Sequence, residues 1–254
     1  MSPTPDMLDL PSPPSPWRRN GGVMILASLA TLAVGCGTLA GARSAGVPGP
    51  TATMLTLLAA TVWIGLVCAP LAAGADEWFG ALLRGGLMAD VSVITLLAVW
   101  AWGGGSIGWA EGVKIYLIWA ALAVVLSLGP QLGSTTASRG GIAVGLTLIN
   151  ALAMSSLFWS AGLLGALGEA GRQTALKCIL WPNPLMGIVS LVGPSTGFVW
   201  AERPVMYSIT RMGQDFPTPP VNWWWPLLIW SILAAGLTLW LMARRVYRSF
   251  VYGA

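Results

Sequence analysis

The chain has 254 residues, of which 56% are hydrophobic and only 9% are charged, and its mean hydropathy is +0.73. Soluble domains carry about 25% charged residues, so this composition excludes an ordinary soluble globular domain and predicts an integral membrane protein with the lipid bilayer around it. The net charge of +4 is spread along the chain and not gathered into a patch, so nucleic acid is not an expected partner.

The chain contains no histidine, which narrows the chemistry it can perform. His-ligated haem, copper and common zinc sites are excluded, as is Ser–His or Cys–His catalysis by this chain alone. Cys36, Cys68 and Cys178 lie far apart without C-x-x-C spacing, which favours small buried hydrophobic residues over a disulfide or metal site. We therefore expect no catalytic residue, no cofactor and no metal, and we do not expect an enzyme.

Long uncharged tracts predict the fold class. A spanning helix needs about 20 apolar residues, and helices satisfy their own backbone groups in lipid. A β-barrel would show short alternating segments instead. The sequence therefore predicts an all-α, polytopic membrane protein with about six transmembrane helices and a re-entrant or interfacial helical segment before the last. The expected helices cover residues 22–41, 51–72, 87–102, 115–132, 142–167 and 224–243.

The first 20 residues are rich in proline and serine and predict a disordered cytoplasmic tail, followed by a single transmembrane helical domain over residues 21–254. The first apolar run has an alternative interpretation as a signal peptide, because residues 40–42 (Ala-Gly-Ala) resemble a cleavage site. The run is longer than the apolar core of a usual signal, and the tail before it is long. Both observations favour a first transmembrane helix.

Residues 168–223 interrupt the pattern and are expected to form an external re-entrant or loop segment. This segment holds an uncharged tract, residues 178–201, that is broken by Pro182, Pro184 and Pro194. Prolines remove backbone donors, and the freed groups are costly to expose to lipid. Short helices that dip into the outer leaflet, or lie on it, fit this pattern. The alternative is a seventh, broken span, which would put the two termini on opposite sides.

The arginines indicate the orientation. With six helices, one side of the membrane holds most of the cations in short loops and at the chain ends, and cytoplasmic loops are enriched in lysine and arginine. Both termini are therefore expected in the cytoplasm. The arginines on that side are Arg18, Arg19, Arg84, Arg139, Arg244, Arg245 and Arg248.

Three polar residues are candidates for a transport pathway or for helix packing. Asn150 lies within the expected fifth helix, with Ser155 after it at nearly helical spacing. Such groups either hydrogen-bond between helices or line a path for a substrate. Asp90 lies near the cytoplasmic end of the expected third helix. An ionisable residue in a membrane segment is a candidate functional site, although a carboxylate close to the interface can also simply be hydrated.

Two motifs stand out from this layout. Asn183 and Pro184 open a short apolar stretch within the external segment. Between the second and third helices, a short segment combines charged residues, a glycine and paired leucines: Glu77, Trp78, Gly80, Leu82, Leu83 and Arg84. Together with six helices, these motifs resemble the membrane subunit of a type-2 ABC exporter. That family has cytoplasmic ends, a re-entrant hairpin that often begins with Asn-Pro, and a coupling segment that docks into an ATPase.

The resemblance implies a membrane-spanning permease subunit of an ATP-driven exporter in a bacterial plasma (inner) membrane. The chain has no G-x-x-x-x-G-K-[ST] phosphate loop, so a separate ATPase subunit would bind the nucleotide. The permease would form a homodimer, or a heterodimer with a similar permease. The alternative is a non-catalytic anchor or scaffold subunit of a larger membrane complex. A carrier without an ATPase is a third interpretation, weakened by the lack of an internal repeat and of intramembrane charge.

Overall fold

The computed structural model describes residues 16–102, 107–193 and 222–252, and the regular structure of these residues is entirely helical. The all-α prediction is therefore confirmed. In chain order the elements are α1 (Pro16–Ser44), α2 (Gly49–Ala73), α3 (Trp78–Trp102), α4 (Trp109–Leu128), the 3₁₀ turn η1 (Gly129–Leu132), α5 (Thr136–Met154), α6 (Ser156–Gly165), α7 (Glu169–Leu180), α8 (Pro184–Val192) and α11 (Trp224–Tyr252).

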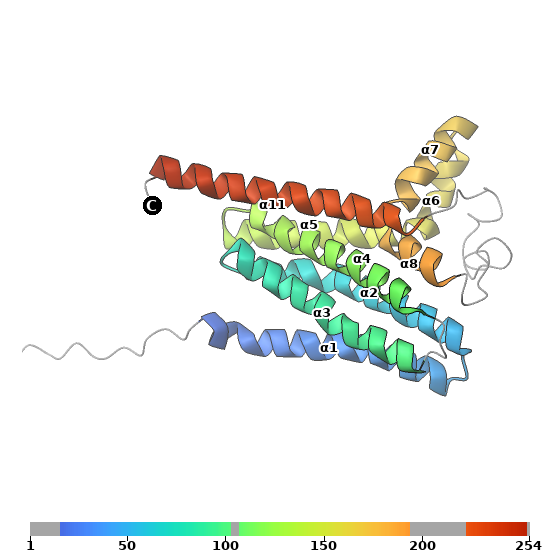
Figure 1. Ribbon diagram of the computed structural model, residues 1–254. Coiled ribbons are helices and arrows are strands. Elements are labelled where there is room, and N and C mark those ends of the chain that lie inside the picture. Colours follow the sequence, from blue (N-terminus) through green and yellow to red (C-terminus); the bar gives the residue numbers. More distant parts are fainter. Residues whose placement is uncertain (1–15, 103–106, 194–221, 253–254) are drawn as a thin grey trace, which may run out of the picture.

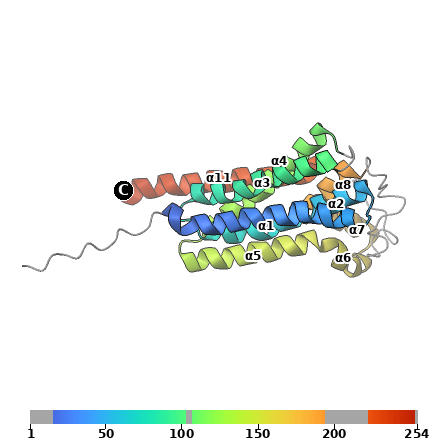
Figure 2. The ribbon, with the colours of Figure 1, turned by 90° about the horizontal axis from the view of Figure 1, so that it is seen from below.

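The protein is a polytopic membrane protein. Within the described residues, six helical stretches are long and apolar enough to cross a bilayer: most of α1, then α2, α3, α4 with η1, α5 and α11. These helices run side by side in alternating directions, and α1 begins at the same end of the bundle at which α11 finishes (Figures 1 and 2). We call this end the terminal end and the opposite end the far end. The α2–α3 connection also lies at the terminal end.

Helix α2 is the centre of the bundle. It packs against α1, α3, α4, α5 and α8, whereas α11 packs mainly against α4 and α8. Half of the most apolar stretch of α2 is buried inside the protein, against 11% of the corresponding stretch of α11. Apolar side chains on a peripheral helix are stable against lipid, so α11 needs no further protein cover for its stability.

One buried hydrogen bond joins the two central helices. Trp119 of α4 is the largest fully buried side chain among the described residues, and its indole Nε1 donates to Oγ1 of Thr61 in α2 over 2.8 Å. The hydroxyl of Thr61 donates in turn to the carbonyl of Leu57 over 2.7 Å. A buried indole N–H needs such a partner, because hydrocarbon offers none. The pair therefore fixes α4 against α2.

Four expected helix starts were wrong, and two of these belong to α4 and α5, which begin at Trp109 and Thr136, each six residues before the predicted start. Helix α3 begins at Trp78, nine residues before the predicted start at Leu87, because the guanidinium of Arg84 finds a backbone acceptor in α2 and does not interrupt the helix. Helix α1 begins at Pro16, so residues 16–20 of the predicted disordered tail are helical. The rest of that predicted tail lies outside the described residues.

The expected fifth helix is divided at Ser155 into α5 and α6. Side chains compete for the carbonyls at the end of α5: Trp159 Nε1 donates to Leu152 over 3.1 Å, and Asn183 Nδ2 donates to Ala153 over 3.1 Å. The predicted continuous helix over residues 142–167 was therefore wrong, because hydropathy continues across the break while the backbone hydrogen bonding does not.

Helices α7 and α8 form the bent segment before the last helix, with an angle of 84° between them. Both lie at the far end, where α5 finishes and α11 begins (Figure 1). Because the chain reaches this pair and leaves for α11 at the same end, the pair is a re-entrant or interfacial segment and not a seventh crossing. The later part of the predicted external segment, including Pro194, lies outside the described residues.

Candidate functional site

Side chains from α3, η1 and α5 hold the end of α2 and the α2–α3 connection. The last carbonyls of a helix lack partners within the helix, and basic side chains commonly satisfy them. Arg84 Nη1 donates to the Leu71 carbonyl over 3.1 Å, and Gln131 Nε2 donates to the Ala72 carbonyl over 3.0 Å. These contacts tie the end of α2 to α3 and η1.

Arg139 of α5 completes this attachment. Its Nη1 donates to the carbonyls of Ala75 and Asp76 over 2.7 and 3.3 Å, and its Nε donates to that of Gly133 over 3.3 Å. One planar guanidinium thus joins the α2–α3 connection to the turn before α5. The connection is therefore hydrogen-bonded to α5, as the end of α2 is to α3 and η1.

The sequence-predicted coupling residues lie at this place, but most of them belong to helix α3 and not to a separate surface segment. Glu77 is exposed just before the helix, and Trp78 is its first residue. Among the described residues, no hydrogen-bond acceptor is found for the buried Nε1 of Trp78. Leu82 is half-buried and Leu83 is exposed. Glu77 and Leu83 are therefore available to a partner, whereas Arg84 has a structural role within the bundle.

A basic pocket of about 280 Å³ opens beside the connection. Arg244 donates from Nη1 to the Leu132 carbonyl over 3.0 Å, which brings the end of α11 to the edge of this pocket. Four arginines and two carboxylates line the pocket, an excess of two positive charges that favours an anionic partner. The lining residues are Asp76, Glu77, Trp78, Gln131, Gly133, Ser134, Arg139, Leu241, Arg244, Arg245 and Arg248.

At the far end, Asn183 and Pro184 form the start of α8. The buried Asn183 caps this helix, because its Oδ1 accepts a hydrogen bond from the backbone N–H of Leu185 over 3.0 Å. Pro184 occupies the first helical position, where no intrahelical N–H bond is needed. Nδ2 of the same asparagine donates to the carbonyls of Ala153 and Met154 over 3.1 and 3.4 Å. The Asn-Pro motif thus fastens α8 to the end of α5.

Aromatic and backbone contacts fasten the same segment to α11. Trp230 Nε1 donates to the Pro182 carbonyl over 2.8 Å. The rings of Trp181 and Trp225 stack with their centroids 3.9 Å apart. Gly187 lies so close to α11 that a β-carbon there would be 2.6 Å from Cγ of Pro226. The bend between α7 and α8 is therefore packed on both α5 and α11.

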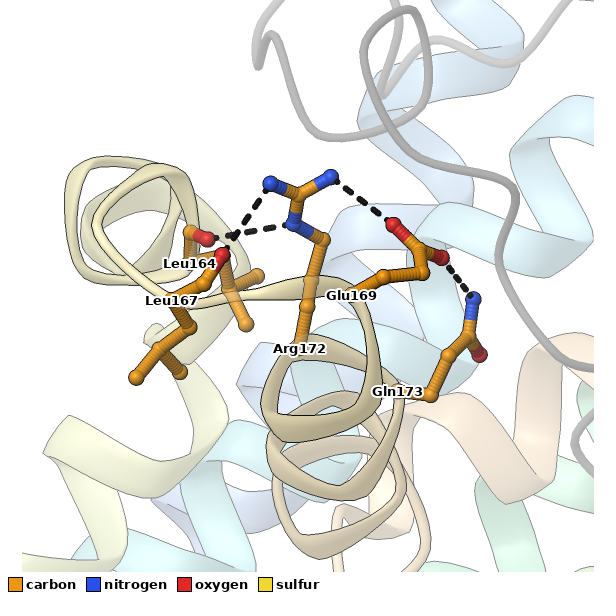
Figure 3. Close-up of polar contacts among 5 residues, drawn as sticks. All are labelled: Leu164, Leu167, Glu169, Arg172 and Gln173. Carbon is orange, nitrogen blue, oxygen red and sulfur yellow. Dashed lines mark hydrogen bonds and ion pairs between the residues drawn. The ribbon is translucent and has the colours of Figure 1, made fainter.

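Arg172 plays a corresponding role between α6 and α7 (Figure 3). Its Nε and Nη2 donate to the carbonyls of Leu164 and Leu167, each over 3.2 Å, while Nη1 pairs with Glu169 over 3.2 Å. The other oxygen of Glu169 accepts from Gln173 over 3.3 Å. These hydrogen bonds and the ion pair hold the turn between α6 and α7, so the start of the far-end segment is fixed by specific side-chain contacts.

The three polar candidates lie in different surroundings. Asn150 is buried at the α2–α5 contact, where a β-carbon on Gly65 would overlap its side chain, so its position indicates helix packing. Its Nδ2 lies 3.7 Å from Sδ of Met154. Ser155 stands at the break after α5, and its hydroxyl donates to the Leu152 carbonyl over 3.3 Å. The structure therefore does not bring Asn150 and Ser155 together with Asp90.

Asp90 does not lie where the sequence pattern predicts it. Because α3 begins at Trp78, Asp90 lies at the midpoint of this 25-residue helix and not near its cytoplasmic end. The side chain is exposed on the surface of the bundle, and its Oδ1 accepts a hydrogen bond of 2.7 Å from the hydroxyl of Tyr116 in α4. Tyr116 was not singled out from the sequence, because a tyrosine in an apolar run carries no signal of its partner.

No protein-family model matches this chain, and neither a curated protein nor a solved structure gives a match. Evidence for the function of this chain comes from the geometry of the bundle itself.

Proposed function

We propose that this chain is the membrane-spanning permease subunit of an ATP-driven exporter and works with a separate ATPase subunit. The observation that supports this function best is the attachment of the α2–α3 connection to α2, η1 and α5 through Arg84, Gln131 and Arg139. A partner that presses on this connection acts on the central helix of the bundle, since α2 contacts most of the other spans and α8.

The proposed mechanism follows from this packing. Glu77 and Leu83 offer one exposed charge and one exposed apolar side chain to the ATPase. ATP binding would move the partner, and the rigid connection would tilt α2 and α5 together. At the far end α8 packs on α2, and Asn183 bonds to the end of α5, so the bent segment moves with them. The substrate path would form between two copies of the permease, or between this chain and a similar one.

The proposed location is a bacterial plasma membrane, with the terminal end in the cytoplasm. Arginines gather at this end: Arg84, Arg139, Arg244, Arg245 and Arg248. At the far end, the helix ends hold Arg43 and Lys114, and the short helix α7 holds Arg172 and Lys177. This excess of cations at the terminal end is the bias that cytoplasmic loops carry.

Purification of the complex tests the function directly. The affinity-tagged full chain is extracted from its native membrane in lipid particles, its companions are identified by mass spectrometry, and ATP hydrolysis is measured. We expect a phosphate-loop ATPase in the purified complex. Recovery of a stable complex without any nucleotide-binding subunit would contradict the permease function and favour the scaffold alternative.

A matched pair of charge reversals tests the docking surface. Glu77→Lys changes an exposed carboxylate on the α2–α3 connection, and Glu111→Lys reverses the charge of a half-buried carboxylate in the first turn of α4 at the far end. Only the first variant should lose the ATPase during purification and abolish the ATP hydrolysis linked to transport. Arg84 is unsuitable for this test, because its substitution would also remove the hydrogen bond to Leu71. Equal retention of the ATPase by both variants would place docking elsewhere.

A further inference from the structure

A carboxylate lies exposed in the middle of the bundle's height. Asp90 is the midpoint of α3, about 18 Å from either end at a rise of about 1.5 Å per residue. No other acidic residue of the described spans lies away from a helix end. An ionised carboxylate at this depth is costly against lipid unless a donor or a cation pairs with it, so such residues mark functional sites by default. The hydroxyl of Tyr116 supplies one donor and leaves the other carboxylate oxygen available.

An apolar groove of about 210 Å³ runs along the same face, between α3 and α4. Asp90 itself does not line the groove, but Val93, one helical turn after it, and its hydrogen-bond partner Tyr116 do, so the carboxylate lies next to one end of the groove. Trp100 and Trp109 stand at its far-end mouth with their ring centroids 5.2 Å apart. The rest of the lining consists of aliphatic side chains together with Gly108 and Gly112.

From this juxtaposition we propose that the α3–α4 groove binds a small lipophilic cation, with its ammonium group paired to Asp90 and its apolar part between α3 and α4. Charge complementarity selects a cation, because the carboxylate has no basic partner among the described residues. The volume of the groove suits one aromatic ring or a short alkyl chain and is too small for a helix. The tryptophans at the mouth attract cations through their ring faces.

This site does not depend on the proposed permease function. Binding of the cation is measured on this chain alone, without an ATPase. A chain that does not bind the cation therefore leaves the permease proposal intact. A purified complex without an ATPase likewise does not count against the cation site.

The test uses the full chain in phosphatidylcholine nanodiscs and the probe phenethyltrimethylammonium, measured by equilibrium dialysis with empty nanodiscs subtracted. The uncharged carbon isostere, in which carbon replaces the ammonium nitrogen, serves as the reference ligand. We expect saturable binding of the cation and at least tenfold weaker binding of the isostere. Equal binding of the two ligands overturns the proposal. Absence of saturable cation binding also overturns it, whatever the cause. One such cause would be a helix of another molecule that covers Asp90.

Three variants localise the binding. Asp90→Asn should weaken the cation at least tenfold, whereas Asp76→Asn, which changes an exposed carboxylate at the terminal end, should leave it unchanged. Gly112→Leu should block the groove while Asp90 stays intact, because a β-carbon on Gly112 meets no other atom within 4 Å. Wild-type affinity in Asp90→Asn or in Gly112→Leu would overturn the assignment. If Asp90→Asn fails to fold, the comparison of the cation with its isostere on the unaltered chain still decides.

Discussion

The side-chain amide nitrogen of Asn183 lies 3.1 Å from the carbonyl oxygen of Ala153, thirty residues earlier in the chain. This contact joins the start of α8 to the end of α5. The two ends of the amide serve different helices. Oδ1 of Asn183 caps α8 by accepting from the backbone N–H of Leu185, and Nδ2 donates to a carbonyl at the end of α5, where the fifth span breaks. Asn183 thus holds the start of α8 against the end of α5.

Substitution of this residue should destabilise the bundle. Asn183→Ala removes a helix cap and leaves the carbonyls of Ala153 and Met154 without their donor, so the free energy of unfolding should fall by about 1–3 kcal/mol. Reversible unfolding in SDS, followed by circular dichroism, measures this change. Asn222→Ala is the matched control, because that side chain is exposed. Equal loss in both variants would contradict the role of Asn183.

Loss of Arg139 should loosen the α2–α3 connection. In Arg139→Ala the carbonyls of Ala75 and Asp76 lose a charge-assisted donor, a contact worth about 1.5–3 kcal/mol when it is well formed. Hydrogen exchange of the backbone amides in residues 74–80 should therefore become faster. Arg245→Ala removes another arginine of the same pocket and should leave this exchange unchanged. Unchanged exchange in Arg139→Ala would show that the connection is held without it.

A methyl group on Gly187 should separate α8 from α11. The β-carbon of an alanine at this position would lie 2.6 Å from Cγ of Pro226, and overpacking of this kind costs about 1–3 kcal/mol of stability. We expect Gly187→Ala to lower the unfolding temperature of the purified protein. Gly236→Ala provides the control within α11, since its β-carbon meets no other atom within 4 Å and alanine favours a helix. An unfolding temperature that does not fall in Gly187→Ala would contradict the close approach.

The bond between Trp119 and Thr61 should appear as a coupling energy. In a double-mutant cycle with Trp119→Phe and Thr61→Val, the interaction should be about 0.6 kcal/mol, the average for hydrogen bonds between membrane helices. SDS titration of the four proteins measures it. Thr238→Val is the control for loss of a threonine hydroxyl, because that hydroxyl bonds to a carbonyl of its own helix. A coupling energy indistinguishable from zero would mean that the pair does not fasten α4 to α2.

The sequence by itself determined that the chain is helical and crosses the membrane about six times, because hydropathy is a local property that adds up along each span. It also singled out Asn183 and Pro184 as the opening of a short apolar stretch, and α8 begins there with Asn183 as its cap and Pro184 in its first turn. The charged connection between the second and third spans was visible for the same reason.

Only the tertiary structure decided where these residues act. Arg84 was expected at an interface, but it lies inside a longer α3 because a carbonyl of α2 accepts its hydrogen bond. Arg139 donates to the carbonyl of Ala75, 64 residues earlier in the chain. Asp90 of α3 accepts a hydrogen bond from Tyr116 of the neighbouring helix α4. Such contacts depend on how helices pack and rotate against one another, which local periodicity does not encode. The groove beside Asp90 follows from the same packing and has no signature in the sequence.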